Sequence, residues 1–137
     1  MPTYDQLAIG DSAAFSKTVS ETDVYLFAGI TGDMNPAHVN AVAAAGNMFK
    51  QRIAHGMLTG SFISTVLAMH LPGPGTIYLS QELQFRAPVF IGDTITARVE
   101  LIEKLEPRKW TKFKTQVHNQ DGKLVVDGTA TVIPPAA

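Results

Sequence analysis

The spacing of apolar residues divides the chain into a helical first half and a second half made of strands. Between residues 20 and 71 apolar side chains recur at helical intervals. They predict a helix after Ser20, a short Ala-rich helix after Asn40 and a longer helix from about Gly56 to His70. From Thr76 onward the period changes to two, which is typical of strands with one buried face. This order of elements favours the α+β fold class.

The alternating segments after Thr76 predict an antiparallel sheet. Asn119-Gln120-Asp121-Gly122 is a typical hairpin turn, and short connections between consecutive strands favour antiparallel pairing. The predicted strands are residues 12–17, before the helices, and then residues 77–86, 94–101, 111–117 and 124–132.

The helix from about Gly56 to His70 is apolar on nearly every side. A helix of this kind is expected to be covered on more than one side. We therefore expect it to lie inside the protein, across a curved sheet. The apolar residues that support this prediction are Met57, Leu58, Phe62, Ile63, Val66, Leu67 and Met69.

Composition narrows the classes of protein that the chain could form. Its 137 residues predict a single domain, residues 1–137. An apolar content of 45% with only 17% charged residues excludes intrinsic disorder and favours burial of some surface by self-association. A net charge of -1 predicts no nucleic-acid or anionic membrane partner. The absence of cysteine excludes disulfides, thiolate metal sites and cysteine nucleophiles.

The distribution of apolar residues also bears on location. The sequence before residue 7 has no basic start and no apolar run, so it predicts no signal peptide. The longest apolar stretch, residues 62–71, is far shorter than the roughly 20 residues that a membrane span needs. We expect a soluble, cytoplasmic protein.

An acid and an imidazole separated by a rigid turn are the first candidates for chemistry. Asp33 precedes His38 by five residues, and Pro36 stiffens the chain between them. General acid–base catalysis needs two titratable groups around one water or one substrate proton, and such a turn can supply that geometry. The alternative is that Asp33 caps the next helix and His38 lies on the surface.

The start of the long helix is the second candidate. Backbone N–H groups at a helix N-terminus lack intrahelical partners and can donate to a carbonyl oxygen that gains negative charge. Gly56 at this position would let a substrate approach the backbone closely. The alternative is an ordinary helix start, with the preceding His55 as a buried or flanking imidazole whose hydrogen bonds are satisfied.

Three segments in order resemble the motifs of one family, the MaoC-like (R)-specific enoyl-CoA hydratases. Residues 31–38 (Thr-Gly-Asp-Met-Asn-Pro-Ala-His) resemble its hydratase 2 motif. Residues 54–58 (Ala-His-Gly-Met-Leu) and 84–94 (Gln-Phe-Arg-Ala-Pro-Val-Phe-Ile-Gly-Asp-Thr) resemble its second and third signatures. The resemblance covers nearly the whole chain.

The resemblance implies a hot-dog fold, in which an antiparallel sheet wraps one long central helix, and a homodimer. It implies that Asp33 and His38 are the catalytic pair and that Asn35 orients the pair or its water. It further implies that the Gly56 N–H polarises a thioester carbonyl and that Ser64 faces the site. No metal and no redox cofactor are expected, and coenzyme A enters only as part of the substrate.

The implied reaction is reversible syn addition of water to a trans-2-enoyl-CoA, which gives the (R)-3-hydroxyacyl-CoA. The acyl tail is expected beside Phe62, Val66 and Met69. Cations at the mouth would bind the phosphates of coenzyme A. The candidates for this role are Lys50, Arg52, Arg86, Arg108, Lys109, Lys112 and Lys114.

Three other functions compete with this interpretation. A (3R)-hydroxyacyl-ACP dehydratase would use the same chemistry on an acyl carrier protein. A hot-dog thioesterase would need an acid on the central helix, and residues 56–70 contain none. A non-catalytic partner subunit of a hydratase would have no physical need for Asp33, Asn35 and His38 together.

Overall fold

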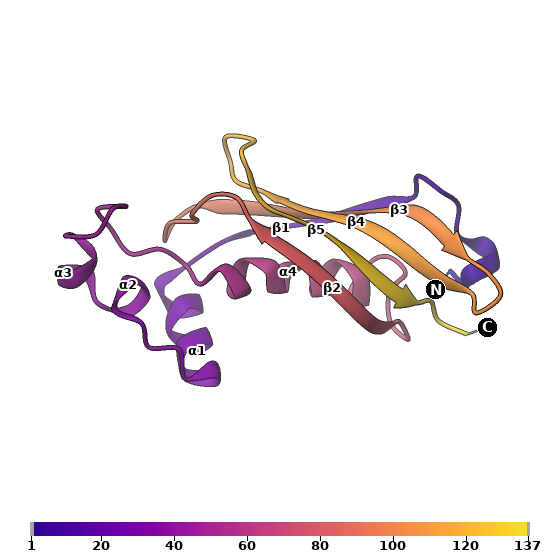
Figure 1. Ribbon diagram of the computed structural model, residues 1–137, viewed down its shortest axis with the longest axis horizontal. Helices are drawn as coiled ribbons and strands as arrows, with labels where there is room; N and C mark the ends of the chain where they lie inside the picture. Colours follow the sequence, from indigo (N-terminus) through magenta and orange to yellow (C-terminus); the bar gives the residue numbers. More distant parts are fainter. Residues whose placement is uncertain (1, 137) are drawn as a thin grey trace.

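A five-stranded antiparallel sheet with one long helix along its face forms the body of the molecule (Figure 1). The computed structural model describes residues 2–136. The strands are β1 (Ser12–Thr18), β2 (Ile77–Phe85), β3 (Thr94–Leu105), β4 (Trp110–His118) and β5 (Leu124–Ile133). The helices are the 3-10 helix η1 (Tyr4–Gln6), α1 (Glu21–Thr31), α2 (Pro36–Val39), α3 (Ala41–Ala44) and α4 (Gly56–Met69). The predicted α+β hot-dog architecture is thus confirmed.

The strand order is β1-β3-β4-β5-β2, and every neighbouring pair is antiparallel. Strands β3, β4 and β5 follow one another as the turn residues predict. Strand β2, which comes directly after α4 in the chain, instead joins the far edge beside β5. The two strands approach closely at Gly128, where an added Cβ would lie 1.8 Å from the carbonyl oxygen of Glu82.

The core lies between α4 and the sheet. Ile63 and Val66 of α4 are fully buried, as are Ile95, Val99 and Phe113 on the strands. Alternation along β3 and β4 places every second side chain in this core, which is the pattern that the sequence predicts. Apolar burial of this kind is the main force that holds α4 across the sheet.

The other side of α4 is exposed, which differs from the sequence-based expectation. Met57 is 56% exposed and Met69 is 62% exposed, and Ser61 and Ser64 between them are exposed as well. Within one chain, therefore, α4 is covered on the side that faces the sheet and not on more than one side.

Helices α1, α2 and α3 gather at one end of the sheet (Figure 1), and local caps define them. The Ser20 hydroxyl accepts from the Asp23 N–H at 3.1 Å, and the Asp23 carboxylate accepts from the Ser20 N–H at 2.9 Å. This capping box starts α1 where the sequence predicts it. Gly32 ends α1 in the left-handed conformation, with φ of 81°.

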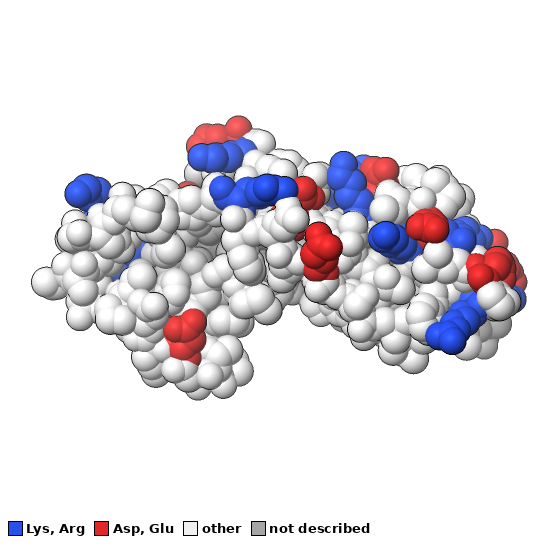
Figure 2. All heavy atoms as spheres, in the orientation of Figure 1, with Lys and Arg blue, Asp and Glu red and all other residues white. Residues whose placement is uncertain are grey.

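Charged side chains of both signs are mixed over the face shown in Figure 2. The end that carries α1, α2 and α3 is mostly uncharged on this face. This distribution agrees with the balanced charge of the sequence. Within residues 2–136, no helix combines the length and the apolar character that a membrane crossing requires.

Candidate active site

The turn between α1 and α2 holds Asp33 through local hydrogen bonds. The Thr31 hydroxyl donates to the Phe27 carbonyl at 2.8 Å and accepts from the Asp33 N–H at 3.1 Å. The Asp33 carboxylate oxygen Oδ1 accepts from the Asn35 N–H at 3.2 Å. These contacts fix the backbone of Asp33 while its side chain remains exposed at the wall of a cavity.

His38 lies on the short helix α2, and its ring has a defined orientation. Its Nδ1 is 2.7 Å from the carbonyl oxygen of Ile53. A carbonyl oxygen can only accept, so Nδ1 carries the hydrogen and, in the neutral ring, Nε2 carries the lone pair. His38 therefore presents a base nitrogen while its other nitrogen is anchored to the backbone.

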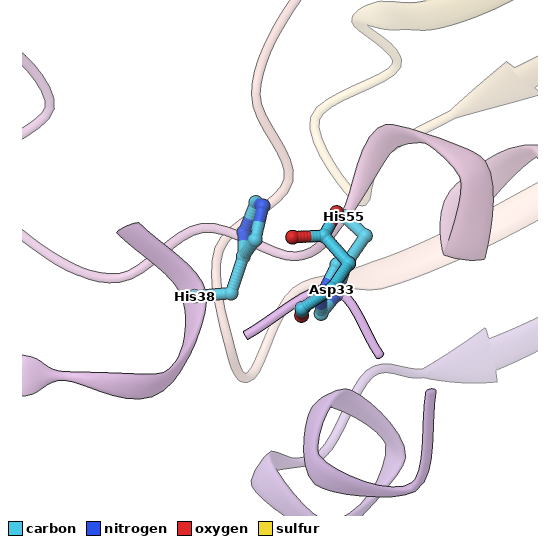
Figure 3. A group of neighbouring side chains, drawn as sticks. All are labelled: Asp33, His38 and His55. Carbon is cyan, nitrogen blue, oxygen red and sulfur yellow. The ribbon is translucent and has the colours of Figure 1, made fainter. Parts of the chain in front are cut away.

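His55 completes a three-residue cluster, which Figure 3 shows with the imidazoles of His38 and His55 beside Asp33. One ligand atom from each of these residues lies within 4.8 Å of those from the other two. The rings of His38 and His55 stack with centroids 3.9 Å apart. The His55 Nε2 is 2.9 Å from the Asp33 carbonyl oxygen, so His55 contacts both other members.

A cavity of about 500 Å³ opens beside this cluster. Gly56, at the start of α4, is part of its wall, and Phe85 of β2 packs against this glycine. The cavity is lined by Asp33, His38, Phe49, Ile53, Ala54, His55, Gly56, Met57, Thr59, Phe85, Arg86, Ala87, Pro88, Val89 and Val126. Asp33, His38 and Gly56, which the sequence singles out from two separate segments, thus share one cavity.

Asn35 and Ser64 lie elsewhere. The Asn35 side chain accepts from the Ala37 N–H at 3.0 Å and caps α2, and Asn35 does not line the cavity. Ser64 lines a second cavity on the exposed side of α4, together with Tyr78 and Leu83 of β2. The two cavities share Met57 in their walls. In this geometry Asn35 supports His38 through its helix, and Ser64 is separated from the Asp–His pair.

The residues expected beside the acyl tail do not line the first cavity. Val66 is fully buried in the core, Phe62 packs against it, and Met69 is exposed further along α4. The apolar part of the wall comes instead from residues such as Phe85 and Val89. The periodicity of α4 identifies its apolar faces, but it does not tell which face meets the sheet and which meets a substrate.

The cationic residues proposed for phosphate binding differ in their position relative to the first cavity and in their partners. Arg86 alone among them lines the first cavity, within the part of the chain that is described. Arg52 is paired with Glu21, its Nη2 lying 2.6 Å from Oε2. Arg108 stacks over Trp110, and Lys109 is 3.7 Å from the carboxylate of Asp5. Arg86 is therefore the candidate whose position fits a contact at the mouth.

Two pKa shifts mark the surroundings of the site. The hydrogen bond and the charge of Arg52 lower the pKa of Glu21 in the first turn of α1. In the second cavity, burial raises the pKa of Tyr78 to about 12. Tyr78 therefore stays protonated at neutral pH and donates a hydrogen bond to Gln81.

Asp33, His38 and His55 form the one group of ligand-type side chains, among residues 2–136, that could surround a metal ion. Each imidazole has one nitrogen against a backbone carbonyl and one remaining nitrogen. The remaining nitrogens are Nε2 of His38 and Nδ1 of His55, and the carbonyl contacts fix their orientation. The two rings are stacked with 28° between their planes. The metal-free reaction expected from the sequence stays a prediction.

Comparison with known proteins agrees with the fold and shows the family of the chain. Residues 6–123 match the family model of the MaoC like domain. The chain is 50% identical over 133 residues to an (R)-specific enoyl-CoA hydratase of Rhodospirillum rubrum, covering 97% of this chain and 92% of the relative. It is 36% identical over 132 residues to a mitochondrial 3-hydroxyacyl-[acyl-carrier-protein] dehydratase of Arabidopsis thaliana, covering 94% and 78%.

Among solved structures, the R-hydratase PhaJ1 from Pseudomonas aeruginosa, in its unliganded form, superimposes with a TM-score of 0.94. It is 47% identical in sequence, and the match covers 98% of this chain and 86% of that one. The fold and the cavity define a hot-dog domain with an Asp–His pair at the N-terminus of its central helix. The chain belongs to the MaoC-like family.

Proposed function

We propose that the protein is an (R)-specific enoyl-CoA hydratase. It would catalyse the reversible syn hydration of a trans-2-enoyl-CoA to the (R)-3-hydroxyacyl-CoA, with Asp33 and His38 acting on one water. The observation that carries this proposal is that the pair lines the same cavity as Gly56 at the start of α4. The relative from Rhodospirillum rubrum, which is 50% identical to this chain and is named as an (R)-specific enoyl-CoA hydratase, supports the choice of substrate.

The orientation of His38 supports a direction for the first proton transfer. Because the Ile53 carbonyl accepts from Nδ1, the lone pair on Nε2 is free to take a proton from water. The water oxygen then bonds to C3 of the enoyl group, and the Asp33 carboxylate stabilises the imidazolium and holds the water. The pair returns one proton to C2, so that both side chains end the cycle as they began it.

Between these two transfers the thioester oxygen carries the charge of an enolate. The Gly56 N–H lies in the first turn of α4, where N–H groups have no intrahelical acceptor and the helix dipole is positive. We propose that it donates to this oxygen. Donors that are fixed before the reaction stabilise developing charge without reorganisation, and one such donor contributes a factor of about 10² to 10³ in rate.

We also propose that two copies pair through the free edge of β2. Ile77 and Leu79 on this strand are 55% and 41% exposed, and the exposed Met57 of α4 lines the second cavity together with Leu79. The opposite edge, β1, exposes only small and polar side chains: Ser12, Ala14, Ser16 and Thr18. Pairing through β2 would cover the exposed side of α4. Light scattering during gel filtration of wild type and Leu79→Lys, which measures the molar mass of each, would test this dimer.

The decisive experiment follows the loss of the enoyl absorbance of crotonyl-CoA with wild type, Asp33→Asn and His38→Gln, and then determines the chirality of the product. Formation of the (R)-alcohol by wild type, with both variants folded and nearly inactive, is the expected result. The His70→Gln variant is the matched control, because His70 lies at the far end of α4 and should keep full activity.

The carrier of the acyl group is settled in a second arm of the same experiment. Crotonyl-CoA is compared with the crotonyl thioester of an acyl carrier protein, since the Arabidopsis thaliana relative is named as a dehydratase of carrier-bound substrates. A much larger kcat/KM with the carrier protein would replace the CoA assignment. No activity of the folded wild type on either thioester would overturn the hydratase proposal and favour a non-catalytic subunit.

A further inference from the structure

We propose that His55 is a positioning residue that holds both members of the catalytic pair; this inference rests on the proposed function. His55 is the residue before α4 and is only 2% exposed. Its ring stacks on the ring of His38 with centroids 3.9 Å apart, and the centroid of the Phe27 ring lies 4.9 Å from that of His55. His55 is neither the general base nor the oxyanion donor of the proposed mechanism. The burial of its side chain in the site therefore needs a separate explanation.

The hydrogen bonding of His55 fixes its tautomer. The Nε2 atom is 2.9 Å from the Asp33 carbonyl oxygen, which can only accept, so Nε2 carries the hydrogen. The Nδ1 atom is buried and has no hydrogen-bond partner among the described residues. A buried polar atom without a partner costs free energy, and an apolar ring such as phenylalanine would avoid that cost. Core packing alone therefore does not explain an imidazole at this position.

The imidazole contacts two parts of the site, and the backbone of His55 is bonded to a third. Its Nε2–H holds the backbone of Asp33, and the face of its ring supports the imidazole of His38. The peptide bond that follows His55 carries the N–H of Gly56, the proposed oxyanion donor. One residue thereby joins the acid and the base, through its side chain, to the donor, through its backbone. Misplacement of such groups by about 1 Å costs on the order of 10² in rate.

Two substitutions separate the contacts of His55. In His55→Phe the ring that stacks on His38 is kept and the hydrogen bond to Asp33 is lost. In His55→Gln a donor is kept and the stacking ring is lost. We expect kcat to fall by roughly 10-fold to 100-fold in each, with KM nearly unchanged, because the reacting groups are displaced while the cavity remains. The His70→Phe variant is the control: His70 stacks on Phe15 at 6.2 Å, away from the pair.

A second measurement does not depend on activity. Nitrogen-15 NMR of the histidine rings in the unliganded wild type should show His55 protonated on Nε2 and His38 protonated on Nδ1. The proposal is overturned if both folded variants keep kcat within about twofold of wild type, or if His55 carries its proton on Nδ1 alone. Should neither variant fold, the ring tautomers decide; wild type that fails on every enoyl thioester refutes the proposed function instead.

Discussion

The ring of Phe85 on β2 lies directly over Gly56 at the start of α4. A Cβ added to Gly56 would lie 2.8 Å from Cδ1 of Phe85, closer than such atoms approach one another in proteins. Both residues line the cavity of the Asp–His pair. A side chain at this position would therefore require the ring of Phe85 to move within the wall of the cavity.

The first prediction concerns this contact. Gly56→Ala should lower kcat/KM on crotonyl-CoA by about 10-fold or more, because the methyl group displaces Phe85 and narrows the approach to the Gly56 N–H. The control is Gly29→Ala in α1, where an added Cβ meets open space. That variant should retain activity and gain about 0.5–1 kcal/mol of stability from helix propensity. Equal activity of both variants would contradict the prediction.

The second prediction distinguishes two roles for Asn35. If its side chain acts as the cap of α2, Asn35→Ala should lower the free energy of unfolding by about 1 kcal/mol and lower kcat, because His38 is held less firmly. Asn35→Asp keeps a capping oxygen and should therefore keep both the stability and the kcat of wild type. Chemical denaturation and steady-state kinetics measure the two effects. Asn40→Ala, which removes the cap of α3, is the matched control and should leave kcat unchanged. Inactivity of Asn35→Asp would instead favour direct orientation of the pair or its water by the amide.

The third prediction concerns the preferred length of the acyl chain. Leu83 packs on Gly60, where an added Cβ would lie 2.9 Å from its Cδ1, and it lines the second cavity with Ser64. Leu83→Ala should enlarge the second cavity, which shares Met57 with the first, and raise the ratio of kcat/KM for octenoyl-CoA to that for crotonyl-CoA by about 10-fold. Ile102→Ala, at a site 40% exposed on β3, should leave the ratio unchanged. A rise of similar size in both variants would contradict this role for Leu83.

The fourth prediction concerns acid. Partial burial of Asp23 opposes its ionisation, but hydrogen bonds from Ser20 and the Lys17 ammonium, 3.1 Å away, outweigh burial and lower the pKa of Asp23. The contact with Arg52 also lowers the pKa of Glu21. Carboxylates with lowered pKa values stabilise the native state above their unfolded pKa, near 4, and lose that contribution as the pH falls through the native pKa.

Because both carboxylates lie in the first turn of α1, acid should weaken the helix that leads to Asp33. Melting temperatures measured between neutral pH and about pH 3 should fall less steeply for Glu21→Gln than for wild type. The control is Glu103→Gln on β3, whose carboxylate forms no ion pair among the described residues and should leave the slope unchanged. Identical slopes for Glu21→Gln and wild type would contradict the assignment.

The sequence predicted local structure well because local rules set it. The capping box at Ser20 and the end of α1 at Gly32 are both determined within four residues along the chain. The cap of α2 was not predicted: it is Asn35, whereas the sequence offered Asp33 as the alternative cap of the next helix. The placement of β2 beside β5 is different, because β2 pairs with the last strand of the chain and no local turn joins the two. Periodicity identifies a strand, but it does not identify the neighbour of a strand.

The same limit applies to the site. Asp33 and His38 are five residues apart on one turn, and spacing alone brings attention to them. The carbonyl of Ile53 that orients His38, and the contact between His55 and the Asp33 carbonyl, join positions 15 and 22 residues apart. Ser64 illustrates the opposite case, because a position that matches a family motif lies in the second cavity. Tertiary placement, not residue type, separates these cases.

The grouping of Asp33, His38 and His55 before α4 has a consequence for inheritance. All three belong to the continuous stretch from α1 to the residue before α4, which connects β1 to the central helix. The sheet supplies walls to the cavity but none of these three groups. A single recombination event that exchanged this connection would therefore transfer the acid and both imidazoles as a unit. The sheet could keep its pairing register and lose these three groups in one step, or gain them beside an N–H donor that α4 already supplies.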